Sequence, residues 1–321
     1  MHSKILDIFF HVAFAIVIFP LLYSLQIYYS FWNMKDYIDT AHEKKIVLFY
    51  DDFKSDHGET VVEIFTSSTQ GEYSILKIDD NRIRVEALEL IVDHLKNSGK
   101  EIYLNVSIQP NDGFYGSIFA NTINRISKSA TITQAIGNNE CLSISLSKFT
   151  GVEKAVIVDR EIYEKLSERV SEIRKISEDE NVSLLISNFG VAYGALFYNF
   201  IDHRDDKMRE LVKEVIHPIL GRKSLSKHEN EIVELYAHVL IRFSYSVLLQ
   251  KISDNENLVV VSSSSQFTTD PTDAYFLDCQ VYGLLKNVVR FPGVWMKEKK
   301  QIFGTSISAP LCLSAVFSKK T

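Results

Sequence analysis

Cysteine is scarce in this chain of 321 residues, and the three cysteines follow no metal-binding or disulfide spacing. Cys141, Cys279 and Cys312 are far apart and odd in number, so paired bridges do not form the framework of the fold. The histidines make no HxxxH or HExxH set, which leaves a zinc hydrolase without support. Calcium-binding loops are not recognisable either. We therefore predict no metal ion and no cofactor, and we expect Cys312 to pack in the interior rather than to react.

The chain also lacks an excess of basic charge. Its net charge is −6, and the basic and acidic residues are mixed along the sequence, which leaves no basic surface of the kind that binds nucleic acid. No internal repeat and no low-complexity run marks a second independent domain. Because 46% of the residues are hydrophobic, a chain of this length is able to bury a substantial core in one domain of ordinary size.

One long hydrophobic run is present, from Ile8 to Phe31. As a helix, it is long enough to cross a hydrocarbon layer of about 30 Å, and aromatic residues gather at its carboxyl end as they do at a membrane interface. His11, Pro20 and Gln26 interrupt the run, but a membrane span tolerates such residues. No A-x-A-like site follows it, which favours an uncleaved anchor over the alternative, a cleaved secretory signal.

The most informative segment lies near the C-terminus, where residues 304–310 read GTSISAP before a short apolar run. The glycine permits a close approach to Ser306, and the following residues can begin a helix whose free N–H groups and positive dipole end would lie near an oxyanion. Pro310 fits the first turn of a helix, where its missing N–H costs least. The pattern indicates a nucleophilic serine at a helix start. The alternative is a simple cap on a buried terminal helix.

A nucleophilic serine needs a general base and a carboxylate that orients this base. The apolar run at 46–50 is typical of a buried strand and ends in Asp51 and Asp52, and His57 follows before a helical segment. In open α/β sheets, active sites lie at the carboxyl ends of the strands. We take His57 as the base and Asp51 as the orienting carboxylate because it directly follows the run; Asp52 is the rival. The alternative is that the two aspartates only stabilise a turn after the strand.

These segments resemble the catalytic motifs of the subtilisin-like serine proteases (subtilases). In that family an Asp closes the first core strand, a His-Gly pair like His57-Gly58 begins a helix, and a GTS motif carries the serine; the chain order Asp, His, Ser agrees. The resemblance implies a three-layer α/β fold with a largely parallel central sheet. The link from Asp51 to His57 is much shorter than in the familiar enzymes, and the chain ends soon after the serine helix begins.

Residues 101–107, which follow a helical segment at 85–98, resemble the subtilase strand that runs along the bound substrate. This resemblance implies that Val106 and Ser107 take part in substrate binding. Two later apolar segments, 142–147 and 183–187, are alternatives for the same strand.

Residues 258–266 (LVVVSSSSQ) resemble the family's strand that ends in small residues and an asparagine. The resemblance implies that Ser263 and Ser264 bind substrate and that Gln266, at the asparagine position, donates to the oxyanion. The side chain of glutamine is one methylene longer than that of asparagine. The backbone at position 266 therefore has to lie farther from the oxyanion for the amide to donate to it. The alternative is that Gln266 only closes a buried strand. Just before the serine motif, residues 291–295 (FPGVW) resemble the family's Ala-Pro-Gly-Val turn.

These observations predict a serine endopeptidase that acts on peptides or proteins. We expect residues 1–34 to form a membrane anchor and residues 35–321 to form the peptidase domain, with an insertion at about 109–230 that contains an amphipathic helix at 159–181. The alternatives are a catalytically degenerate subtilase fold that binds peptides or a partner protein, and an unrelated α/β protein whose segments match by chance.

The predicted localisation is a single-pass membrane protein. Basic residues flank the run on both sides, so the positive-inside rule barely separates the two orientations. An extracytoplasmic domain is the convention for a membrane-anchored protease, whereas the unpaired cysteines favour the other side slightly. We lean towards the extracytoplasmic side.

Overall fold

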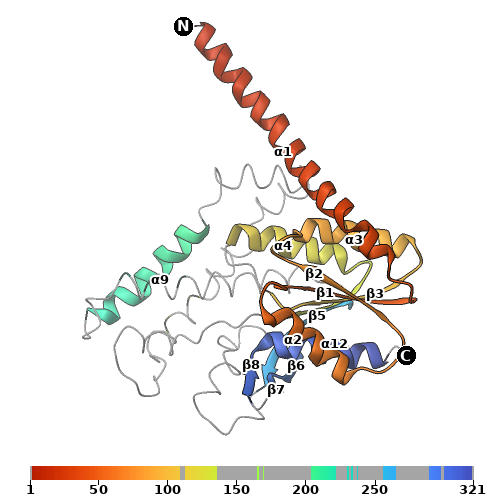
Figure 1. The fold of residues 1–321 in the computed structure, drawn as a ribbon. Coiled ribbons are helices and arrows are strands. Elements are labelled where there is room, and N and C mark those ends of the chain that lie inside the picture. The colour runs from red at the N-terminus through yellow and green to blue at the C-terminus, as the bar shows by residue number, and fades with distance from the viewer. Residues whose placement is uncertain are drawn as a thin grey trace.

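The computed structural model of the protein describes residues 2–108, 113–135, 204–221, 256–264, 289–297 and 300–319, with residues 165, 169, 230, 233 and 237 placed singly between them. Helices and strands alternate through most of this part of the chain (Figure 1). The helices are α1 (His2–Asp39), α2 (Asp56–Ser68), α3 (Val85–Asn97), α4 (Gly113–Ile126), α9 (Arg204–Leu220) and α12 (Thr305–Lys319). The strands are β1 (Lys45–Asp51), β2 (Ser74–Asp79), β3 (Glu101–Val106), β4 (Thr131–Ala135), β5 (Leu258–Ser264), β6 (Val289–Pro292), β7 (Val294–Lys297) and β8 (Lys300–Phe303).

Strands β1 to β6 form one sheet in the order β2-β1-β3-β4-β5-β6. All neighbouring pairs in it are parallel, whereas β7 and β8 form a separate antiparallel pair. The α/β class with a parallel central sheet, predicted from the sequence, is confirmed. The sequence also located β1, β3, β5 and α3 to within about two residues.

Helices cover both faces of this sheet: α3 and α4 lie on one face, and α2 and α12 lie on the other (Figure 1). We call these the α3 face and the α12 face. Side chains of a strand point alternately to opposite faces, and β1 and β3 follow this rule. Those that pack in the core of the α3 face are Ile46, Leu48, Tyr50, Ile102, Leu104 and Val106. Those that pack in the core of the α12 face are Val47, Phe49 and Tyr103.

Helices α2 and α12 begin at the same edge of the sheet, where the parallel strands end. Ser55 caps α2 by accepting a hydrogen bond from the N–H of His57 at 3.3 Å, which satisfies one of the free N–H groups of the first turn. Gly304 precedes α12 with a φ of 140°, a conformation that favours glycine. Farther along, Ser314 of α12 donates to the carbonyl of Ser68 in the last turn of α2 at 2.6 Å, so the two helices run side by side.

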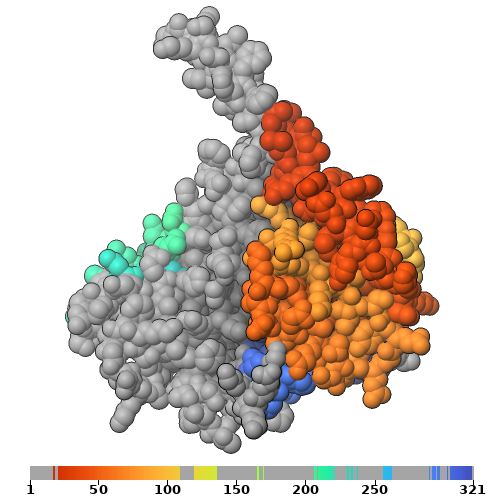
Figure 2. Space-filling view, in the orientation of Figure 1, coloured from red at the N-terminus to blue at the C-terminus, as the bar shows by residue number. Residues whose placement is uncertain are grey.

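The N-terminal membrane span and the single-pass localisation predicted from the sequence are wrong. Within the part of the chain that the structure describes, no helix is long and apolar enough to cross a membrane. Helix α1 continues without a break past residue 34, the predicted boundary of the anchor. In its carboxyl half, Ile27 and Phe31 pack against the core of the α3 face and Ile38 is fully buried. Ile27 and Phe31 of the predicted span therefore contact protein, whereas Leu21, Leu22 and Leu25 are exposed. Figure 2 shows this half of the helix on the surface of the molecule.

The range 109–230, interpreted from the sequence as an insertion, contains elements of the central layers. Strand β4 lies in the sheet between β3 and β5, and α4 packs beside α3. The strands expected at 142–147 and 183–187 lie outside the described residues. The same is true of nearly all of the helix expected at 159–181.

Candidate active site

Asp51 and His57 form a hydrogen-bonded pair at the carboxyl end of β1. The Nδ1 atom of His57 lies 2.7 Å from Oδ1 of Asp51. Asp51 is the last residue of its strand and is fully buried, whereas the side chain of His57 is 40% exposed. A buried carboxylate on Nδ1 fixes the ring and directs Nε2 away from the strand end. This is the arrangement that a general base requires.

The short link between the two residues is built as a tight strand-to-helix connection. The N–H of Gly58 donates to the carbonyl of Asp52 at 3.1 Å. A Cβ atom on Gly58 would lie 2.8 Å from the ring of Phe53 and 3.0 Å from the carbonyl oxygen of Asp52. Because neither gap accommodates a side chain, this connection requires glycine at position 58.

Alternation along β1 explains why Asp51, and not Asp52, contacts the histidine. Asp51 continues the row of Val47 and Phe49, so it lies on the α12 face, where α2 begins. Oδ1 of Asp52 instead accepts hydrogen bonds from the backbone N–H groups of Lys54 and Ser55 and from the Asn81 amide. Hydrogen bonding by Ser55 lowers the pKa of Asp52. Asp52 therefore organises the link, while Asp51 holds the imidazole of His57.

The charges around the pair are mostly negative. The hydrogen bond to Asp51 raises the pKa of His57 above its ordinary value; burial opposes this effect, and the carboxylates of Asp52 and Asp80 add to it. Burial raises the pKa of Asp80 to about 6, and the nearby carboxylates reinforce the shift. Oδ2 of Asp51 is buried without a hydrogen-bond partner among the described residues.

Ser306 lies in the first turn of α12, above the carboxyl end of β3. The N–H of Gly304 donates to the carbonyl of Gly293 at 3.0 Å, which ties the helix start to the turn after β6. Ser107, just past the end of β3, donates its hydroxyl to the carbonyl oxygen of Ser306 at 3.3 Å. Ser306 itself is only 5% exposed.

The sheet register brings the serine turn to the same edge as the Asp51–His57 pair. Tyr50 on β1 pairs with Val106 on β3, so Asp51 and Ser107 follow at neighbouring strand ends, and parallel strands lie about 4.8 Å apart. Both side chains are on the α12 face, where α2 and α12 pack together. No hydrogen bond between His57 Nε2 and Ser306 Oγ is among those of the described residues.

Of the other predicted site residues whose side chains the structure describes, only Ser107 lies on the α12 face beside Asp51 and Ser306. The side chain of Val106 is fully buried in the core of the α3 face, so only its backbone borders the α12 face. Ser107 is on the α12 face and 8% exposed. Ser263 and Ser264 end β5, which is separated from β3 by β4. Gln266 lies outside the described residues.

Two buried polar residues near Ser107 were not predicted. Asn105 of β3 donates its amide to the Ser107 hydroxyl at 2.7 Å, and Thr133 of β4 donates to the Asn105 side-chain oxygen at 3.3 Å. Asn105 and Thr133 are both fully buried. A polar residue inside an otherwise apolar strand is the signal that marks Asn105 in the sequence, and alternating threonines mark β4.

An acidic group lies beside the site. The carboxylates of Asp52, Asp79 and Asp80 offer oxygen atoms within 4.8 Å of one another, and oxygen ligands of this kind suit calcium or magnesium. The Asn81 amide, however, donates to all three carboxylates, and Arg82 pairs with Asp79 at 3.3 Å. Side chains of the protein thus supply hydrogen-bond donors to this group.

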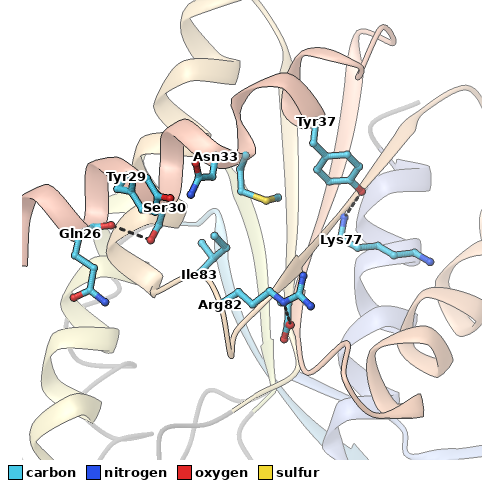
Figure 3. A pocket seen from close by; sticks show the side chains of 10 residues that line it. Gln26, Tyr29, Ser30, Asn33, Tyr37, Lys77, Arg82 and Ile83 are labelled. Atoms are coloured by element: carbon cyan, nitrogen blue, oxygen red, sulfur yellow. Dashed lines mark hydrogen bonds and ion pairs between the residues drawn. The ribbon is translucent and has the colours of Figure 1, made fainter.

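A pocket lies between α1 and the edge strand β2 (Figure 3). Its volume is about 580 Å³, and the N–H of Lys77 donates to the hydroxyl of Tyr37 in its wall at 3.1 Å. The residues that line it are Gln26, Tyr29, Ser30, Asn33, Met34, Tyr37, Lys77, Asp79, Arg82 and Ile83. The pocket shares Asp79 with the acidic group but contains neither His57 nor Ser306.

Comparisons with protein-family models, with curated proteins and with solved structures find no match to this chain. The resemblance to subtilases therefore rests on the sequence motifs alone.

Proposed function

We propose that the protein is a subtilase-like serine endopeptidase whose catalytic triad is Asp51, His57 and Ser306. The observation that carries this proposal is the hydrogen bond of 2.7 Å between Asp51 and His57, at the sheet edge where the turn of Ser306 is also bound through Ser107. A buried carboxylate, an oriented and partly exposed histidine, and a serine at a helix start are the three parts that acyl transfer needs.

In the proposed reaction, Ser306 Oγ attacks the carbonyl carbon of a peptide bond while its proton passes to Nε2 of His57. The Asp51 carboxylate accepts the hydrogen bond from Nδ1–H, so that Nε2 is the nitrogen left free to take the proton. The histidine then gives this proton to the leaving amine. Water, activated by the same nitrogen, hydrolyses the acyl ester of Ser306 and regenerates the serine.

The oxyanion of this reaction requires preorganised donors. The N–H of Ser306, at the positive end of α12, is one proposed donor, and the side-chain amide of Gln266 is the other. Two other residues are candidates for this second donor, Asn138 and Asn139. They follow β4 in the sequence, and β4 lies next to β3 in the sheet. Removing the true donor should slow the reaction by about 10²–10³-fold, so alanine variants at the three positions identify it.

The second candidate function is a subtilase-like fold that binds peptides without cutting them. The observations that favour it are the low exposure of Ser306 and the missing hydrogen bond between His57 and Ser306 among the described residues. Catalytic hydrogen bonds are often long before substrate binds, so these observations do not outweigh the Asp51–His57 pair.

Labelling with a fluorophosphonate tests the proposal, because this reagent reacts with activated serines. We expect the wild type to be labelled at Ser306, as located by peptide mass spectrometry, and labelling to be lost in Ser306→Ala and in His57→Ala. Ser314→Ala is the matched control, since it removes another buried hydroxyl from α12. A well-folded wild type that is not labelled, or undiminished labelling in Ser306→Ala, would contradict the proposal.

A further inference from the structure

We propose that Ser107 is a positioning residue that holds the carbonyl group of Ser306, because Pro310 leaves this carbonyl without a helical partner. This inference deepens the proposed function and rests on it for its catalytic consequence. Its structural part, the hydrogen bond between two segments 199 residues apart in the sequence, is testable on its own.

The need for Ser107 follows from the helix itself. In an α-helix, the carbonyl of each residue accepts from the N–H four residues later. The residue four positions after Ser306 is Pro310. The sequence placed this proline in the first turn, but it lies farther inside α12, where its missing N–H removes a hydrogen bond of the helix. The carbonyl of Ser306 is therefore without its usual donor, although Ser306 is buried. An unpaired buried carbonyl is destabilising, and the Ser107 hydroxyl supplies the donor at 3.3 Å.

The direction of this hydrogen bond is set by a chain of buried polar groups. The Ser107 hydroxyl has a single proton, and its oxygen already accepts from the Asn105 amide at 2.7 Å. The Ser306 carbonyl can only accept, so the single proton of Ser107 goes to it. The Asn105 amide therefore turns its NH₂ group to Ser107, and its oxygen accepts from the Thr133 hydroxyl. The chain thus runs from β4 through β3 to α12.

The contact acts on the nucleophile through backbone geometry. The carbonyl of Ser306 belongs to the peptide plane that directly follows the nucleophile, so holding it constrains the direction of the Cα–Cβ bond that carries the Ser306 hydroxyl. Other hydroxyls hold other parts of the helix: Ser308 donates to the carbonyls of Phe291 and Pro292 at 3.1 Å, and Ser314 donates to Ser68. Of these hydrogen bonds, the one from Ser107 is the one that ends on the residue proposed to react.

The experiment is a double-mutant cycle on Ser107→Ala and Pro310→Ala, since alanine at position 310 restores the missing N–H. Two quantities are measured in each variant: the rate of fluorophosphonate labelling, and the ¹³C chemical shift of the Ser306 carbonyl. The shift is read from protein labelled with ¹³C-carbonyl serine and ¹⁵N isoleucine, in which the Ser306-Ile307 signal is assigned by its loss in Ser306→Ala. Ser314→Ala is the control for loss of a buried hydroxyl on α12.

We expect Ser107→Ala to move the Ser306 carbonyl shift and to slow labelling by roughly 10–100-fold, as small misplacements of reacting groups do. In the Pro310→Ala background the same change should have a smaller effect on both quantities, because the carbonyl then has a helical donor. Ser107→Thr, which keeps the hydroxyl, should resemble the wild type. Should Ser107→Ala fail to fold, Ser107→Cys replaces it, since a thiol is a much weaker donor.

The two readouts separate the two proposals. An unchanged Ser306 carbonyl shift in Ser107→Ala, or an effect of equal size with and without Pro310, overturns the inference about Ser107. A wild type that is folded but not labelled overturns the peptidase proposal, and the carbonyl shift then still decides whether Ser107 holds Ser306.

Discussion

The two faces of the central sheet share the same strands and differ in how the rows of side chains end. On the α3 face, β1 and β3 remain apolar to their carboxyl ends, with Tyr50 and Val106 in the core. On the α12 face, the same strands turn polar near that edge, where Asp51, Asn105 and Ser107 replace the apolar residues. One face thus holds the domain together, and the other carries buried polar groups that are hydrogen-bonded to the starts of two helices.

Adjacent residues in one strand are therefore able to serve separate purposes. A strand residue contacts only the layer that it faces, so a change on the α3 face should act on stability and a change on the α12 face should act on the site.

The largest effect is expected for Asp51→Asn compared with Asp52→Asn. An amide at position 51 favours the wrong tautomer of His57, and loss of the orienting carboxylate in a Ser-His-Asp site lowers the rate by about 10⁴-fold. Asp52→Asn keeps an oxygen acceptor for the link and should change the labelling rate only a few-fold. Labelling kinetics with the fluorophosphonate measure both, and a larger loss in Asp52→Asn would show that the triad carboxylate is misassigned.

Next in size is Leu104→Ala, which changes the residue beside Asn105 on the opposite face. Leu104 is fully buried in the core of the α3 face, and such a truncation lowers the free energy of unfolding by about 2–5 kcal/mol. Urea unfolding measures this loss. The labelling rate of the folded protein should stay near that of the wild type; a fall as large as that of Ser107→Ala would mean that the two faces are coupled.

A smaller loss of stability is expected where α1 joins the α3 face. Tyr23 donates to the carboxylate of Glu86, which is 5% exposed, and Arg84 donates to the Tyr23 hydroxyl at 3.2 Å. Tyr23→Phe removes a partner from a buried carboxylate and should lower the free energy of unfolding by about 1–3 kcal/mol. Tyr29→Phe, on the exposed side of the same helix, is the control and should be neutral in the same urea titration.

The smallest effects concern pH. His57 accepts a proton from the serine only when it is neutral, so labelling should increase as pH rises through the pKa of His57, which is raised above the ordinary histidine value by Asp51. Asp80 contributes to this shift, and Asp80→Asn should therefore move the midpoint of the pH profile to lower pH. A midpoint that stays in place would show that Asp80 does not influence the base.

Stability should respond to the same substitution in a defined pH window. The pKa of Asp80 is about 6 in the folded protein and near 4 for an unfolded chain, so the folded state loses stability as pH rises between these values. Asp80→Asn should be equal to the wild type below pH 4 and more stable at pH 7. Because Asp80 is half-exposed, the gain should not exceed about 1 kcal/mol. Urea unfolding at the two pH values measures it.

Much of the fold was accessible from local patterns in the sequence. The apolar runs of β1, β3 and β5 and the helical spacing of α3 are strong periodic signals, and they led to the correct α/β class. Strands β2 and β4 were missed: β2 is a half-exposed edge strand, and β4 has five residues of which three are polar. The N-terminal helix was misread because an apolar run does not tell that some of its side chains, such as Ile27 and Phe31, pack on the protein itself.

The candidate site likewise contains residues that the sequence motifs identified and residues that only the structure revealed. The motifs selected Asp51, His57 and Ser306, but the sequence left Asp51 and Asp52 as rivals, and only the side of the sheet on which each lies separates them. Asn105 and Thr133 were not selected, since the hydrogen bond between them joins two different strands. The catalytic roles and the donor at Gln266 stay predictions.

The sequence contains an acidic strand end before a His-Gly helix start, and a proline, which has no N–H, four residues after Ser306. These are local facts, because a strand's alternation and a helix's i to i+4 pairing are set within a few residues. The group that replaces the missing donor is instead set by the fold. Strand order places Ser107 beneath a residue 199 positions away, and no local pattern encodes that distance.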